Sequence, residues 1–254
     1  MPSCRECAEL VDERCLAEAR SLDVLGDRKR PAPLAACPIP IVENYVRIIG
    51  RGSSVLEVGC GSWSRLRDHC LEVGANYEGI DGVQSAGSVA TRFENLADLS
   101  FPDDTFDFVV GTQSMEHWAE YGCSLEWGLY QCFRVSKRGG RVMMNVPIHF
   151  HGTADFMLGR LERLRHLFEV FSTDVLFEEW GRQSDPIPAY YPYPGYLPLR
   201  GKPAYVLDIQ AVRNKDLPDG IENKARTGLL GKFQTKPMSY ALYSAGCRVL
   251  GVSR

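Results

Sequence analysis

Between Ser53 and Pro147 short apolar runs alternate with helical stretches, and this alternation limits the fold more than any other feature of the sequence. The apolar runs are SVLEV, YEGID, FDFVVG and RVMMNVP, each of a length that suits one buried strand. The helical stretches are SRLRDHCLEVGA and SLEWGLYQCFRVSKRGG, the second closed by glycines. Strands that alternate with helices build βαβ units around a parallel sheet. The pattern therefore predicts a doubly wound, Rossmann-like α/β fold.

The sequence after Pro147 is less regular. FMLGRLERLRHLFEVF predicts one amphipathic helix, DVLFEEWG a strand and PAYVLDIQAVR a long alternating strand. DPIPAYYPYPGYLPLRG separates the two strands and holds five prolines and four tyrosines. This segment is either a wall over a ligand or a surface loop packed on the sheet. The tail gives weak signals, with a short helix expected around Tyr240 to Ala245.

We expect one large domain with additions at both ends, because 254 residues suit a single α/β core. Residues 1–40 form a charged helical segment that ends in the proline-rich RPAPLAACPIP. Residues 41–213 form the main domain, with a Tyr/Pro-rich insertion at 185–200. Residues 214–254 form a C-terminal tail packed on that domain.

Composition excludes several classes of protein. A formal net charge of −3 gives no electrostatic footprint for nucleic acid, and no apolar run reaches the roughly 20 residues of a membrane span. The first residues contain no signal-peptide core, and nine scattered cysteines are typical of reduced thiols, so a cytoplasmic location is expected. Cys4 and Cys7 form a CxxC pair without a second pair, so no metal site is predicted. Both a monomer and a homodimer remain open.

The turn VLEVGCG lies where a strand meets a helix, which is where open α/β sheets bind ligands. A dinucleotide turn follows GxGxxG, whereas Gly59 and Gly61 are followed by Trp63 near the place of the third glycine. Glu57, two residues before the first glycine, would repel a pyrophosphate but attract a cationic ligand. A nicotinamide-dependent oxidoreductase is therefore disfavoured.

Four blocks together resemble the class I S-adenosylmethionine-dependent methyltransferases, in particular small-molecule enzymes of the methyltransferase type 11 kind. VLEVGCG is similar to their first motif, and YEGID ends in an acid at the place where the family holds the ribose. SFPDDTFDFVVGTQSMEHW is similar to the run through their fourth strand, and KRGGRVMMNVP to the turn into the fifth. The resemblance covers about residues 40 to 150. It implies a seven-stranded sheet whose last strand is antiparallel, S-adenosylmethionine as cofactor, and the N-terminal segment as a helical cap.

The resemblance also implies roles for single residues. Glu57 would act on the ammonium group of the cofactor, and the backbone of Gly59 and Gly61 would approach its methionyl part. Asp81 would hold the ribose. The remaining implied contacts are Asn95 and Leu96 at the adenine, with Asp98 nearby, and Thr112 and Gln113 on the methionyl side.

The chain departs from the family pattern at two points. Trp63 replaces the third glycine, which implies that an aromatic side chain closes the turn. Only thirteen residues separate Asp81 from Asn95, where many members of the family insert a helix and a strand. Asn95 stands where an aspartate is common, and its amide oxygen can still accept from the adenine amino group.

Three histidines follow the ends of strands that should be adjacent: His117, His149 and His151. His149 and His151 are two residues apart, so in extended chain they would face the same way, and Asp155 could orient one of them. They could act as a general base, ligate a metal, or be loop residues bonded to carbonyl groups. For His117, packing of a helix is the stronger interpretation.

The predicted function is transfer of a methyl group from S-adenosylmethionine to a small-molecule acceptor. A hydroxyl of a sugar or natural-product metabolite is favoured, because the acidic surface disfavours nucleic acid and tyrosines suit a ring. Two alternatives stay open: a small-molecule N-methyltransferase, and a non-catalytic protein that binds S-adenosylmethionine.

Overall fold

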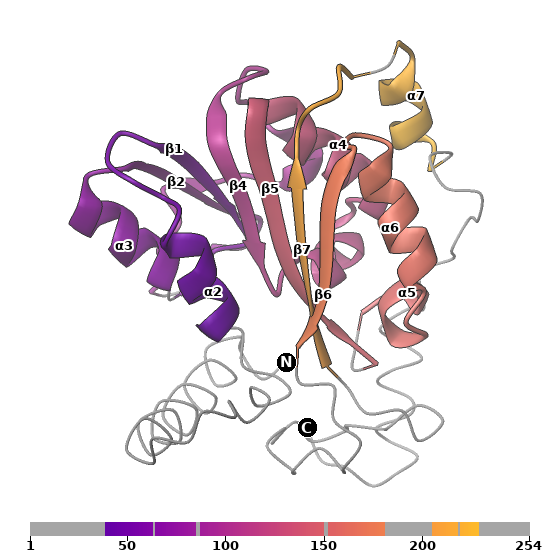
Figure 1. Ribbon diagram of the computed structural model, residues 1–254, viewed down its shortest axis with the longest axis horizontal. Coiled ribbons are helices and arrows are strands. Elements are labelled where there is room, and N and C mark those ends of the chain that lie inside the picture. Colours follow the sequence, from indigo (N-terminus) through magenta and orange to yellow (C-terminus); the bar gives the residue numbers. More distant parts are fainter. Residues whose placement is uncertain are drawn as a thin grey trace, which may run out of the picture.

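Seven strands form one sheet in the order β3-β2-β1-β4-β5-β7-β6 (Figure 1). The computed structural model describes residues 39–62, 64–84, 87–149, 152–180, 205–217 and 219–228. The strands are β1 Ser54–Val58, β2 Asn76–Asp81, β3 Arg92–Phe93, β4 Phe106–Thr112, β5 Ser136–Ile148, β6 Asp174–Trp180 and β7 Tyr205–Val212. The helices are α2 Ile39–Val46, α3 Arg65–Val73, α4 Leu125–Val135, α5 Ala154–Met157, α6 Leu161–Glu169 and α7 Ile221–Arg226. Two 3₁₀ helices, η1 Leu96–Asp98 and η2 Met115–Tyr121, complete the order.

The direction of the strands confirms the predicted fold class. β1 to β5 run parallel to one another, and β7 lies antiparallel between β5 and β6. The last strand is therefore inserted antiparallel, as the resemblance implied. As a consequence, the carboxyl ends of β1, β2, β4 and β5 meet at one edge of the sheet, which we call the cofactor edge.

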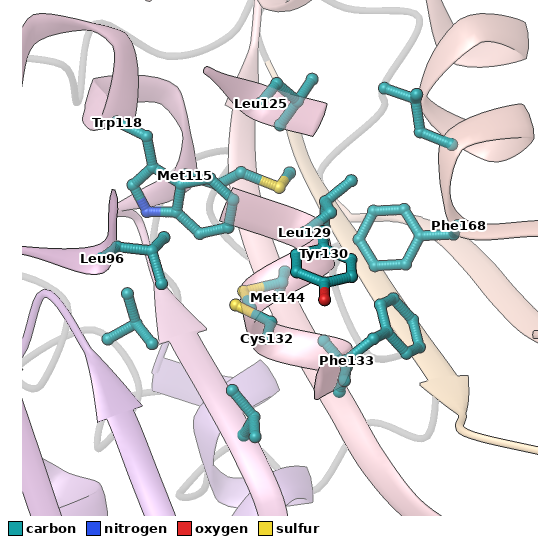
Figure 2. Close-up of a cluster of buried hydrophobic side chains, with 14 of the residues drawn as sticks. Leu96, Met115, Trp118, Leu125, Leu129, Tyr130, Cys132, Phe133, Met144 and Phe168 are labelled. Atoms are coloured by element: carbon teal, nitrogen blue, oxygen red, sulfur yellow. The ribbon is translucent and has the colours of Figure 1, made fainter. Parts of the chain in front are cut away.

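Helices cover both faces of the sheet. On one face α2 and α3 pack through Tyr45, Leu66 and Cys70 against inward side chains of β1, β4, β5 and β7. On the other face α4, α6 and α7 enclose a larger core, in which Phe133 packs edge-on against Phe168 with ring centroids 6.1 Å apart (Figure 2). The near-continuous apolar runs noted in the sequence follow from this double burial.

Two predicted helix boundaries were wrong. The glycines of SKRGG were expected to close a helix, but α4 ends at Val135 and the next residue begins β5. Ser136 pairs with Phe106, and the register then shifts so that Arg141 pairs with Phe108. The extra residues between them form a bulge, which Lys137 fastens to Asp107 through an ion pair of 2.8 Å.

The second correction concerns FMLGRLERLRHLFEVF. It is not one helix but α5 and α6, separated at Gly159, which has φ +62°. A Cβ at this position would lie 2.6 Å from Cε1 of His149, so the chain bends around that imidazole. A contact with a residue distant in sequence decides this break, and the local pattern could not show it.

Several predictions fall outside the described residues: the N-terminal segment and its CxxC pair, Trp63, His151, the Tyr/Pro-rich insertion and the helix near Tyr240. Within the tail the structure instead has α7, which the sequence did not predict, packed on α4 with the Arg226 guanidinium 4.2 Å from the Trp127 ring centroid. No helix in the described part of the chain has the length and apolarity to cross a membrane.

Candidate cofactor and acceptor site

The glycine turn after β1 lies at the cofactor edge. Gly59 and Gly61 have φ values of +73° and +61°, which favour glycine. A Cβ on Gly59 would lie 2.6 Å from the Cβ of Ser114, whereas a Cβ on Gly61 would meet none of the described residues within 4 Å. Gly59 thus allows β1 and η2 to approach each other, and Gly61 leaves open space where a ligand could contact the backbone.

Glu57 at the end of β1 is almost fully buried, with 4% of its surface exposed. Its Oε2 accepts hydrogen bonds from the hydroxyls of Ser64 and Tyr77, the latter at 2.6 Å. Burial raises the pKa of Glu57 to about 7, although both hydroxyls act to lower it. A group with this pKa changes charge near neutral pH.

Asp81 ends β2 beside the turn. Its Oδ2 accepts from the backbone N–H of Gly61 at 3.0 Å, and its Oδ1 accepts from the N–H of Val83 at 3.0 Å. The carboxylate is half-buried, and each oxygen can accept a further hydrogen bond. Asp81 therefore fastens the turn and keeps capacity for the hydroxyls of a ribose.

Asn95 and Leu96 are engaged by the protein itself. The Asn95 amide oxygen caps η1 by accepting from the N–H of Ala97 at 2.8 Å, and its amide nitrogen donates to the Tyr121 carbonyl at 2.8 Å. The Leu96 side chain is buried beside Trp118 (Figure 2). At this segment the backbone is thus the better candidate to meet an adenine, and the Leu96 side chain belongs to the core.

Thr112 and Gln113 end β4 at the same edge. Gln113 has φ +48°, and its backbone N–H donates to the Asn145 carbonyl at 2.9 Å. Its Nε2 is buried without a hydrogen-bond partner among the described residues, and so is Oγ of Ser114. Ser114 was missed by the sequence interpretation, although it stands directly after Gln113; its contact with Gly59 depends on tertiary structure.

His117 lies on η2, with about a third of its side chain exposed. Nδ1 is 3.1 Å from Oε1 of Glu120, and Nε2 is 3.8 Å from Oε1 of Glu116. Burial on its own would lower the pKa of His117, but the two carboxylates outweigh burial and raise it. His117 is therefore protonated to a greater extent at neutral pH than a free histidine.

His149 follows β5 with φ +61°, so the chain is not extended at this residue. Its ring is buried and packs edge-on against Tyr205 at 5.8 Å between centroids. Nδ1 lies 3.1 Å from the Met157 carbonyl, which accepts only from an N–H. This contact holds the neutral ring in the tautomer that leaves Nε2 unprotonated.

The structure brings the segment after β5 against η2. A Cβ on Gly152 would lie 2.8 Å from the Cβ of Glu116. Asp155, considered as a partner for a histidine, accepts from Nε of Arg163 at 3.1 Å, and Arg163 also binds Glu126. The described contacts of Asp155 thus form a buried ion-pair network that joins α4, α5 and α6.

A polar row on the α2 face begins at Thr112, and its two buried members, Asn145 and Asp208, were missed by the sequence interpretation. Thr112, Asn145 and Asp208 are register neighbours on β4, β5 and β7, and the Tyr45 hydroxyl donates to Asp208. Burial raises the pKa of Asp208. The Asn145 side chain is fully buried and makes no hydrogen bond of normal geometry with described residues. This row lies on the opposite face from His149, which packs toward α5.

These residues fit an adenosyl sulfonium with an amino-acid tail. Open space at Gly61, carboxylates at Glu57 and Asp81, and the unpartnered donors of Gln113 and Ser114 share one edge. Of the three non-glycine residues with positive φ in the described chain, two are Gln113 and His149. Such backbone outliers are enriched at functional sites.

Known proteins resemble the central part of the chain. Residues 56–144 match the family described as "Methyltransferase domain". A probable S-adenosylmethionine-dependent methyltransferase of Mycolicibacterium smegmatis is 31% identical over 113 residues, which are 41% of this chain and 42% of that protein. A chloroplastic 2-methyl-6-phytyl-1,4-hydroquinone methyltransferase of Oryza sativa subsp. japonica is 30% identical over 117 residues, 46% of this chain and 29% of that protein.

A solved structure shows the same fold. Phosphoethanolamine N-methyltransferase 2 of Haemonchus contortus, with phosphomonomethylethanolamine and S-adenosylhomocysteine bound, matches with a TM-score of 0.50 at 13% identity. The match covers 70% of this chain and 52% of that one. Residues 56–144 thus resemble a methyltransferase domain, and the sheet that contains them has the Rossmann-like methyltransferase fold. The chain spans less than half the length of the curated relatives that it matches.

Proposed function

We propose that this protein binds S-adenosylmethionine at the cofactor edge and transfers its methyl group to a hydroxyl of a sugar or natural-product metabolite. One observation carries the proposal: the open glycine turn, two carboxylates and two unpartnered buried donors lie at the same edge. Glu57 would face the ammonium group, Asp81 the ribose, and Gln113 and Ser114 the methionyl part. S-adenosylmethionine supplies an electrophilic methyl group on its sulfonium.

For the acceptor, the protein must align a nucleophile and remove its proton. Alignment of two reactants supplies much of the acceleration in such a displacement, and a base near neutral pKa helps a hydroxyl to react. His149 is the better candidate base, because the Met157 carbonyl holds its Nδ1 proton and leaves Nε2 able to accept one. The raised pKa of His117 makes its neutral form scarcer.

The first experiment tests the cofactor. Binding to the folded state raises the melting temperature by mass action, so S-adenosylhomocysteine should raise it and NAD should not. Asp81→Ala should abolish the shift, since the carboxylate both fastens the turn and holds the ribose. Asp103→Ala is the matched control, because Asp103 pairs with Arg134 away from this edge. A shift with NAD alone would refute the proposal.

The second experiment tests the acceptor. Methyl-labelled S-adenosylmethionine is incubated with panels of monosaccharides, phenols and primary amines. We expect label on hydroxyl compounds, and His149→Gln should then lower kcat at least tenfold while the affinity for S-adenosylhomocysteine stays within about twofold. Label on amines alone would establish an N-methyltransferase instead. Tight cofactor binding without transfer to any panel would favour a non-catalytic binding protein.

A further inference from the structure

Two hydroxyl groups hold the Glu57 carboxylate through the same oxygen. Ser64 Oγ and Tyr77 Oη both donate to Oε2, and no described residue donates to Oε1. A carboxylate oxygen can accept more than one hydrogen bond, so this arrangement concentrates the protein's donors on one side of the group. The other oxygen keeps its full capacity for a ligand.

Each of the two hydroxyls is fixed by a second contact. Ser64 is the N-cap of α3, and its Oγ accepts from the backbone N–H of Arg67 at 2.9 Å. The Tyr77 hydroxyl lies over Gly79, where a Cβ would stand 2.4 Å from that oxygen. Glycine at position 79 therefore makes room for the tyrosine. Strand β1, strand β2 and helix α3 meet at one carboxylate.

We propose that Ser64 and Tyr77 are positioning residues for the cofactor, which orient Glu57 so that Oε1 and its negative charge receive the cofactor's ammonium group. This inference rests on the proposed placement of the methionyl part at the turn. A carboxylate held in this way requires no rearrangement when the ligand arrives, which is the advantage of a preorganised site.

The charge state of Glu57 gives the proposal a pH signature. Burial raises the pKa of Glu57 to about 7 and the two donors act to lower it, so removing a donor should raise this pKa further. The titratable neighbours that face the group are Tyr77 on β2, Cys60 in the turn, and Asp68 and Cys70 on α3. Burial raises the pKa of each of these two thiols to about 12, which is outside the range of the experiment.

Calorimetric titration of two probes tests the inference. S-adenosylhomocysteine carries the ammonium group, and 5′-methylthioadenosine has the same adenosyl part without it. For the unaltered protein, affinity for S-adenosylhomocysteine should rise from pH 6 to pH 8 as Glu57 ionises, and affinity for methylthioadenosine should stay flat. Tyr77→Phe should lower the affinity for S-adenosylhomocysteine about tenfold at pH 7 and shift the pH dependence of this affinity to higher pH. The affinity for methylthioadenosine should change less than about twofold.

Matched variants separate positioning from folding. Ser64→Thr keeps a hydroxyl that can cap α3 and donate to Glu57, so it should bind both probes like the unaltered protein. Glu57→Gln should remove the pH dependence. Tyr130→Phe deletes a tyrosine hydroxyl on the opposite face, where the ring stacks on Trp127, and should change neither probe.

Equal weakening of both probes by Tyr77→Phe would overturn the inference, because it would mean that the hydroxyl only shapes the turn. Unchanged affinity for S-adenosylhomocysteine would overturn it as well. The proposed function fails in a different way, since then the unaltered protein would bind neither probe.

Discussion

At the scale of single residues, the two glycines of the turn have different duties despite similar backbone angles. Gly59 is required for protein packing, because a side chain there would collide with Ser114. Gly61 faces open space, and its N–H donates to Asp81. The motif in the sequence presents them as equivalent, and only the contact with η2 separates them.

Substitution of each glycine by alanine should show this difference. Gly61→Ala should lower the free energy of unfolding by about 1–2 kcal/mol, because alanine disfavours the left-handed backbone. It should reduce the free energy of S-adenosylhomocysteine binding by more than this. Gly59→Ala should add a packing penalty of about 1–3 kcal/mol to the same backbone cost. Urea unfolding and cofactor titration measure both effects. In the double variant Gly59→Ala/Ser114→Gly the packing part should largely disappear; full persistence of the loss would contradict the proposed collision.

At the scale of elements, a buried hydrogen bond ties α2 to the inserted strand. The Tyr45 hydroxyl donates to Oδ1 of Asp208 on β7, and Gln210 donates to Oδ2 at 2.9 Å. Burial raises the pKa of Asp208, and the tyrosine's hydrogen bond opposes that rise. A carboxylate whose pKa is raised in the folded state destabilises the fold as pH rises through the window above its usual value.

The variant Tyr45→Phe should therefore lose more stability at pH 8 than at pH 5.5. At the higher pH it leaves a buried charge with one donor fewer, at a cost of about 1.5–3 kcal/mol. At the lower pH the carboxyl is protonated to a greater extent and the loss should be smaller. Urea unfolding at the two pH values measures it, with Tyr130→Phe as control. Asp208→Asn should remove the pH dependence of the loss, and an equal loss at both pH values would count against this account.

At the scale of the whole molecule, the alternation of strand-like and helical segments predicted the architecture correctly. It could not predict the break at Gly159 or the bulge before Arg141, since both depend on partners distant in sequence: His149 for the first, Asp107 and Phe106 for the second. The site followed the same rule. Glu57, Gly59, Gly61 and Asp81 were proposed from the glycine turn and from the family resemblance, whereas Ser114 has no signature of its own.

The sequence by itself determined the class of fold and the place of the glycine turn after the first strand, because apolar periodicity and turn chemistry are local properties. Only the tertiary structure decided which side-chain groups remain available to a ligand. It occupied Oε2 of Glu57 and the amide of Asn95 with internal hydrogen bonds, and it bound Nδ1 of His149 to the Met157 carbonyl, which leaves Nε2 as the acceptor. These hydrogen bonds can join residues far apart in the sequence, as for Glu57 and Tyr77, which are 20 positions apart. They also depend on the face of the sheet toward which each side chain points.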